Sequence, residues 1–95
     1  MSALDQIAVK IIKEQELIIG PLAWSEAGKV SGLQIVDQKK GEVELKNGDP
    51  KEVVNRLVAQ YERLFGRASH EACKDAVRSM IANLPAAEVP SSLLA

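Results

Sequence analysis

His70 and Cys73 are the two residues of this chain whose types and spacing come closest to a catalytic pair. Three positions apart in a predicted helical turn, they would share one face of the helix. A thiol near a helix N-terminus with a neighbouring imidazole can be activated as a nucleophile. A dyad also needs an orienting group, and Asp75 would point elsewhere. We therefore interpret Cys73 as a small core residue and His70 as solvated, and predict no enzyme; a cysteine-based enzyme is the remote alternative.

Metal and nucleotide chemistry find little support in the residues. One His and one Cys cannot close a zinc site, which takes four ligands. Glu42 and Glu44 alternate with apolar residues, which is typical of the wet side of a strand. The glycines follow neither phosphate-binding spacing, G-x-G-x-x-G nor G-x-x-x-x-G-K-[ST]. We expect no catalytic residue, no metal and no cofactor.

The charges of the chain are nearly balanced, with 12 basic and 13 acidic residues and a net charge of −1. Proteins that bind the phosphate backbone usually carry a basic surplus, and docking on an anionic membrane needs one too. The basic groups are Lys39 and Lys40 at a predicted hairpin tip and a set mixed with acidic residues: Arg56, Arg63, Arg67, Lys74 and Arg78. A nucleic-acid-binding module with a wing-like hairpin remains an alternative that we do not favour.

Length and composition predict one small globular domain. The 95 residues are 46% hydrophobic and 26% charged, and only 3% are aromatic, so the core must be aliphatic. We expect a single compact domain over 1–84 and a loosely ordered C-terminal tail over 85–95, which is rich in Pro and Ser. Cys73 has no partner for an internal disulfide. Neither a signal peptide nor an apolar segment of about 20 residues is visible, which predicts a cytoplasmic protein with no membrane contact.

The first part of the chain predicts two helices. Apolar residues recur at helical spacing over 3–19, with Ser2 as the cap and Gln15 interrupting the stripe. Gly20-Pro21 follows, and because proline is tolerated in a first helical turn but costly in a helix interior, a second helix is expected at about 21–30. A single kinked helix is the alternative.

Residues 32–47 change from helical spacing to alternation. Apolar and polar residues alternate on both sides of a turn at 37–41, which predicts an antiparallel hairpin. Gly41 can take positive φ in that turn, and Val36 breaks the alternation and would point to the other face. A lone hairpin is marginal by itself, so it must pack on the helices or pair with a second copy.

Two more helices follow. Asp49, Pro50 and Glu52 form the strongest helix-start signal in the chain, and Gly66 closes the strongly amphipathic helix that begins there. Ser69 is expected to cap a last helix, which ends before Pro85. The fold class is therefore α+β, mostly helical, in the order α-α-β-β-α-α, with one antiparallel hairpin packed on about four helices.

The apolar run 16–24 contains the only Trp and is broken by Gly20-Pro21. The apolar surface of this run is larger than a short hairpin can bury. We therefore expect a contact surface that excludes water, made by Ile18, Ile19, Leu22 and Trp24. We therefore predict a small protein–protein interaction or regulatory module, homodimeric or bound to another protein. The alternative is that Trp24 fills the core of one chain.

Overall fold

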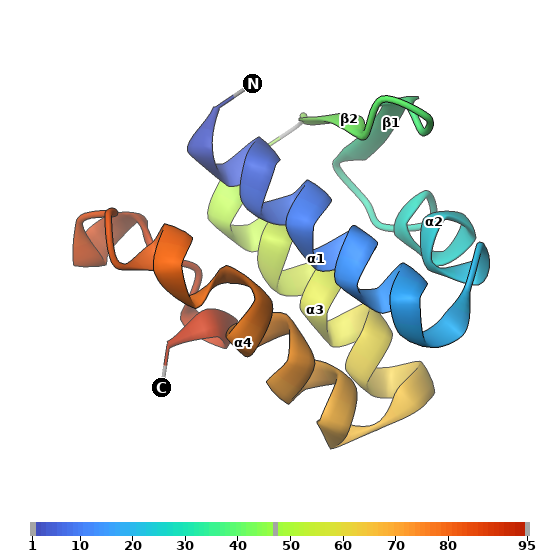
Figure 1. Ribbon diagram of the computed structural model, residues 1–95. Helices are drawn as coiled ribbons and strands as arrows, with labels where there is room; N and C mark the ends of the chain where they lie inside the picture. Colours follow the sequence, from blue (N-terminus) through green and yellow to red (C-terminus); the bar gives the residue numbers. More distant parts are fainter. Residues whose placement is uncertain (1, 47, 95) are drawn as a thin grey trace.

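The computed structural model describes residues 2–46 and 48–94 and has the predicted class and order of elements (Figure 1). The elements are α1 (Ala3–Ile19), α2 (Leu22–Ala27), β1 (Leu33–Asp37), β2 (Glu42–Leu45), α3 (Pro50–Phe65), α4 (Arg67–Ile81) and two 3-10 turns, η1 (Ala86–Glu88) and η2 (Ser91–Leu93). The prediction of an α+β fold with four helices and one antiparallel hairpin is confirmed.

The break at Gly20-Pro21 makes α1 and α2 two helices, not one kinked rod. Ser2 and Asp5 form a capping box at the start of α1, as the sequence predicts for the Ser2 cap. The helix ends at Gly20, whose φ of 71° suits glycine. The second helix ends at Ala27, earlier than the predicted residue 30, because tight turns take over; the N–H of Val30, for example, donates to the carbonyl of Ala27 at 3.1 Å.

The hairpin pairs Leu33 with Leu45 and Ile35 with Val43. Its register shifts between Ile35 and Asp37, so Val36 lies exposed on the outer face, as its break in the alternation predicts. The tip glycine, Gly41, has the expected positive φ of 68°. The buried side chain of Val43 faces α1, which β2 contacts directly.

Helix α3 begins at the predicted position, with the Asp49 side chain accepting a hydrogen bond from the Lys51 N–H at 3.0 Å. Gly66 ends it with a φ of 89° and is followed at once by α4. The prediction that Ser69 caps the last helix is wrong. The glycine joins the two helices without a loop, so α4 already begins at Arg67 and Ser69 lies buried in its first turn.

Three helices form the body of the molecule (Figure 1). Helices α1 and α3 run in the same direction, α4 runs back along them, and the hairpin and α2 lie at the other side of α1. The buried hydrophobic residues between them are aliphatic except for Trp24, Tyr61 and Cys73. No helix within residues 2–46 and 48–94 combines the length and the apolarity needed to cross a bilayer.

The segment that follows α4 is packed, although the sequence favours a loose tail over 85–95. It turns back and places η2 against α3 (Figure 1). The side chains of Val89, Pro90 and Leu93 are buried. Asn55 on α3 and His70 on α4 form hydrogen bonds with the segment. The composition of residues 85–95 does not reveal these distant partners, so the sequence alone predicts a loose tail.

Candidate functional site

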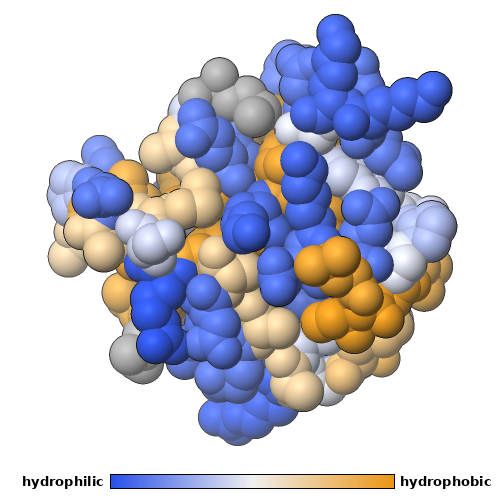
Figure 2. Space-filling view, viewed as in Figure 1, coloured by the Kyte–Doolittle hydropathy of each residue, from blue (hydrophilic) through white to orange (hydrophobic). Residues whose placement is uncertain are grey.

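Three exposed aliphatic side chains lie where α1 meets α2, and two of them, Leu17 and Ile18, are the most exposed large hydrophobic residues of the described ranges. Leu17 is 81% exposed, Ile18 60% and Leu22 45%. Figure 2 shows the resulting hydrophobic patch over the end of α1 and its junction with α2. We call these three residues the apolar corner. Scattered apolar residues on a surface are ordinary, but a contiguous group of large ones typically marks a contact site.

Leu64 lies on the side of α3 that faces α2. Two of its neighbours on α3 reach α2: Tyr61 donates to the carbonyl of Ala23 at 2.7 Å, and Gln60 donates to Glu26 at 2.8 Å. Leu64 lies three and four residues beyond them, hence on the same side of the helix and one turn nearer its end. Its side chain is 43% exposed.

Hydrogen bonds below the apolar corner fix the position of its backbone. The indole N–H of Trp24 donates to the Glu16 carboxylate at 3.0 Å and so ties α2 back to α1. The hydrogen bond from Tyr61 to Ala23 ties α2 to α3 in the same way. The exposed side chains therefore sit on a fixed backbone, which reduces the entropy lost when a partner binds.

The predicted contact residues divide into two groups. Ile18 and Leu22 lie exposed in the apolar corner, whereas Ile19 is half-buried against the core. Trp24 is only 3% exposed, so the structure places its ring in the core of one chain. Leu17 is not among the residues that the sequence predicts for this surface. It lies on the polar side of α1, and that position indicates that its side chain is exposed.

A buried carboxylate locks α2 onto α3. Glu26 accepts hydrogen bonds from Lys29 at 3.0 Å and from Gln60 at 2.8 Å. These bonds, the one from Lys29 first, hold the pKa of the Glu26 carboxyl below its ordinary value although burial opposes the shift. Arg63 in turn donates to Gln60 at 2.6 Å. The network keeps α2, and with it Leu22, in place.

His70 and Cys73 contact different groups in the structure and not each other's partners. His70 lies between the Ser92 carbonyl, 2.6 Å from its Nε2, and the Glu62 carboxylate, 3.2 Å from its Nδ1. Cys73 is fully buried, and burial raises the pKa of its thiol to about 11. A nucleophilic cysteine needs a thiolate, so this environment opposes activation.

Gln15, which interrupts the apolar stripe of α1, connects α1 to α4 by hydrogen bonds inside the core. Its side chain is fully buried, and its Nε2 donates to the Ser69 carbonyl at 3.1 Å and toward the Cys73 sulfur at 3.4 Å. The Ser69 hydroxyl donates back to the Gln15 Oε1 at 3.2 Å. This closed cluster satisfies the polar atoms that α1 and α4 bury between them.

The acidic residues do not assemble a metal site in the described ranges 2–46 and 48–94, where no group of three or more His, Cys, Asp and Glu side chains could hold an ion. Glu44 instead lies 3.4 Å from Lys46 on the outer face of the hairpin.

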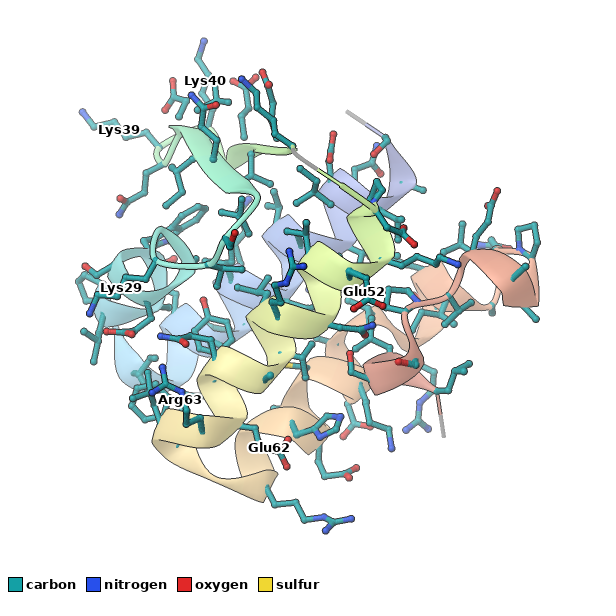
Figure 3. All side chains as sticks on the ribbon, turned by 180° about the vertical axis from the view of Figure 1, so that it is seen from behind. Lys29, Lys39, Lys40, Glu52, Glu62 and Arg63 are labelled. Atoms are coloured by element: carbon teal, nitrogen blue, oxygen red, sulfur yellow. The ribbon has the colours of Figure 1, made fainter. Side chains whose placement is uncertain are left out.

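The basic residues that the structure describes do not form one stripe either. Lys39 and Lys40 extend from the hairpin tip, while Arg63 lies at the far end of the molecule (Figure 3). Several helical cations neutralise acidic neighbours: Lys74 lies 3.8 Å from Glu71, and Arg78 lies 2.6 Å from Asp75.

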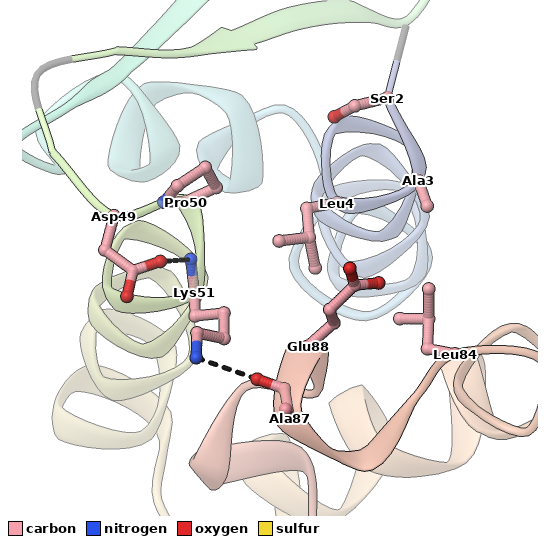
Figure 4. Close-up of a pocket in the computed structure, with 9 residues that line it drawn as sticks. All are labelled: Ser2, Ala3, Leu4, Asp49, Pro50, Lys51, Leu84, Ala87 and Glu88. Carbon is pink, nitrogen blue, oxygen red and sulfur yellow. Dashed lines mark hydrogen bonds between the residues drawn. The ribbon is translucent and has the colours of Figure 1, made fainter.

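A cavity of about 340 Å³ opens between the start of α1, the start of α3 and η1 (Figure 4). Its lining is largely apolar and includes Leu4, Pro50 and Leu84. The Lys51 ammonium at its edge already donates to the Ala87 carbonyl at 2.8 Å. The first turns of both helices carry caps from their own chain, which leaves the cavity weakly equipped to orient a ligand.

Compared with known protein families, with curated proteins and with solved structures, the chain matches none of them. The geometry described above therefore carries the functional argument by itself.

Proposed function

We propose that this protein is a small protein–protein interaction module that forms a homodimer through the apolar corner. The observation that carries the proposal is the exposure of Leu17, Ile18 and Leu22 around the junction of α1 and α2, where Figure 2 shows a hydrophobic patch. Burying apolar surface contributes a transfer free energy of about 25 cal/mol for each Å², from which the cost of lost translational and rotational freedom is subtracted.

The charges beside the apolar corner favour a second copy as the partner. Lys10 and Glu14 lie on the exposed side of α1, with 3.8 Å between their charged groups, and Lys13 lies next to them. A two-fold axis brings the same patch of two chains together, so opposite charges around a common apolar centre can face each other. A net charge of −1 adds little repulsion between the copies.

The test is the oligomeric state of three proteins at micromolar concentrations, measured by sedimentation velocity. The wild-type chain is expected to be a dimer and Ile18→Glu a monomer with an unchanged circular dichroism spectrum. Val36→Glu is the matched control, because Val36 is equally an exposed aliphatic residue but lies on the outer face of the hairpin. A wild-type monomer would refute the homodimer, and equal dissociation by both variants would refute the role of the corner.

Nucleic-acid binding is the second candidate, supported by Lys39 and Lys40 at the hairpin tip (Figure 3). Contacts with phosphates release counterions, so such binding weakens steeply as salt rises. A mobility shift with DNA or RNA at low salt that Lys39→Ala and Lys40→Ala remove would support this candidate. Absence of binding at low salt would eliminate it.

A further inference from the structure

The segment 89–94 is seated in the molecule as a bound peptide would be. Residues 82–88, which connect it to α4, are exposed except for Leu84, and the chain then folds back (Figure 1). Only beyond this link do side chains become buried again, at Val89, Pro90 and Leu93.

Asn55 on α3 recognises this segment through its amide group. Its Oδ1 accepts hydrogen bonds from the Ser92 N–H at 3.0 Å and from the Ser92 hydroxyl at 2.7 Å. Its Nδ2 donates to the Ser91 hydroxyl at 3.2 Å. One side chain thus contacts the main chain of the segment and both of its serines.

His70 on α4 recognises the other side of the same residue. Its Nε2 lies 2.6 Å from the Ser92 carbonyl oxygen, which can only accept a hydrogen bond. The N–H and the carbonyl of Ser92 are therefore each held by a side chain from a different helix. A few placed polar groups that fix orientation, beside apolar anchors, are the usual features of a ligand site.

These contacts are of a kind that another chain can reproduce. They involve main-chain atoms, two hydroxyl groups and the buried side chains of Val89, Pro90 and Leu93. The link 82–88 is exposed, so release of the segment gives up only the contacts of residues 89–94, among them the places of Val89 and Leu93 in the core. A partner segment must refill these places, because an empty site in the core is destabilising.

We propose that the surface formed by α3 and α4 around Asn55 and His70 is a recognition site for a short segment of a partner protein, and that residues 89–94 are its internal, displaceable occupant. The partner segment has the same chemistry: a proline followed by two hydroxyl-bearing residues and a leucine that enters the core. This site is independent of the apolar corner and does not rest on the homodimer.

The experiment measures binding of a fluorescent peptide with the sequence of residues 85–94 to the full-length chain by anisotropy. Leu93→Asp removes the internal anchor, which is 5% exposed, and is expected to bind the peptide at least about tenfold more tightly than wild type, because an occupied site lowers the apparent affinity. Leu94→Asp is the matched control; Leu94 is 49% exposed, and this variant should bind as wild type does.

Adding Asn55→Ala to the Leu93→Asp chain is expected to weaken binding roughly tenfold, since its hydrogen bonds to the peptide are lost. A folded Leu93→Asp chain that binds the peptide no better than Leu94→Asp does would overturn the proposal. A wild-type dimer that Leu93→Asp dissociates would also overturn it, in favour of exchange of this segment between two copies.

A second measurement covers the case in which Leu93→Asp does not fold. Unlabelled peptide is added in excess to the 15N-labelled wild-type chain, and the amide signals of Ser92 and Leu93 are followed. Displacement should move both signals toward the positions of an unstructured chain while those of α1 stay in place. Unmoved signals at millimolar peptide would overturn the proposal.

Discussion

The side-chain amide of Gln15 on α1 lies against the thiol of Cys73 on α4, with 3.4 Å between Nε2 and Sγ. The two residues are 58 positions apart in the chain, and both side chains are fully buried. The contact sets how α1 and α4 align, because a shift along either helix would leave the amide without its partners on α4.

Replacing Gln15 should therefore be costly. Gln15→Ala leaves a cavity and deprives the Ser69 hydroxyl of its acceptor, so the free energy of unfolding should fall by about 2–4 kcal/mol. Denaturant unfolding followed by circular dichroism measures the loss. Asp75→Ala is the control, since its ion pair with Arg78 is exposed and should cost less than about 0.5 kcal/mol. Equal stability of the two variants would contradict the role assigned to Gln15.

The buried thiol predicts a loss of stability at alkaline pH. The pKa of Cys73 is raised from 9.0 to about 11 in the folded chain, so the unfolded chain loses this proton first as pH rises. The stabilisation that the buried neutral thiol provides is fully present below pH 9.0 and is lost as pH rises to about 11, and it amounts to about 3 kcal/mol. Urea unfolding between these pH values should show a shallower decline for Cys73→Ala. An identical decline in both proteins would show that the thiol does not titrate as the structure requires.

The carboxylate of Glu26 predicts the opposite behaviour in acid. Because hydrogen bonds from Lys29 and Gln60 lower its pKa from 4.5, its contribution to stability is present above that pH and is lost as pH falls below it. Unfolding measured from pH 6 downward should therefore decline less steeply for Glu26→Gln than for wild type. Glu71→Gln, at an exposed residue beside Lys74, serves as the control and should follow wild type. If the free energy of unfolding of Glu26→Gln declined with falling pH as steeply as that of wild type, the hydrogen-bond network between α2 and α3 would be contradicted.

Two glycines with almost the same φ separate backbone strain from steric overlap. Gly32 has a φ of 90° and Gly66 one of 89°. A Cβ on Gly32 would lie 2.7 Å from the Lys46 carbonyl oxygen and 2.8 Å from Val53, whereas a Cβ on Gly66 meets nothing within 4 Å. Both alanine variants should lose the 1–3 kcal/mol typical of such strain, and Gly32→Ala should lose about 1–3 kcal/mol more. Thermal unfolding of the pair tests this, and equal losses would contradict the close approach of the hairpin to α3.

Local chemistry made most of the fold predictable. The Ser2 cap, the break at Gly20-Pro21 and the Asp49 cap depend on residues within one turn of each other, and each lies where the sequence places it. The alternation of the hairpin likewise gave the outward position of Val36. Such signals survive folding because the nearest neighbours in sequence supply both partners of the interaction.

The candidate site was only partly predictable for the opposite reason. The apolar run 16–24 pointed to the right part of the chain, but only packing decides which of its side chains are covered. Trp24 is buried because Glu16 accepts its N–H and the core receives its ring. Leu17 is exposed because no element of the described part of the chain packs over its side of α1. The seat of residues 89–94 depends on Asn55 and His70, which show no pattern in sequence.

The sequence by itself determined the helices, the hairpin and their order, because caps, glycines and hydrophobic periods act over a few residues. Only the tertiary structure decided what the residues that depart from those patterns do. Gln15 interrupts a stripe in sequence and closes a polar cluster in space, and Ser69 is expected as a cap but lies inside a helix as its partner. The physical reason is that a buried polar group is defined by its distant hydrogen-bond partner, which adjacent residues do not reveal.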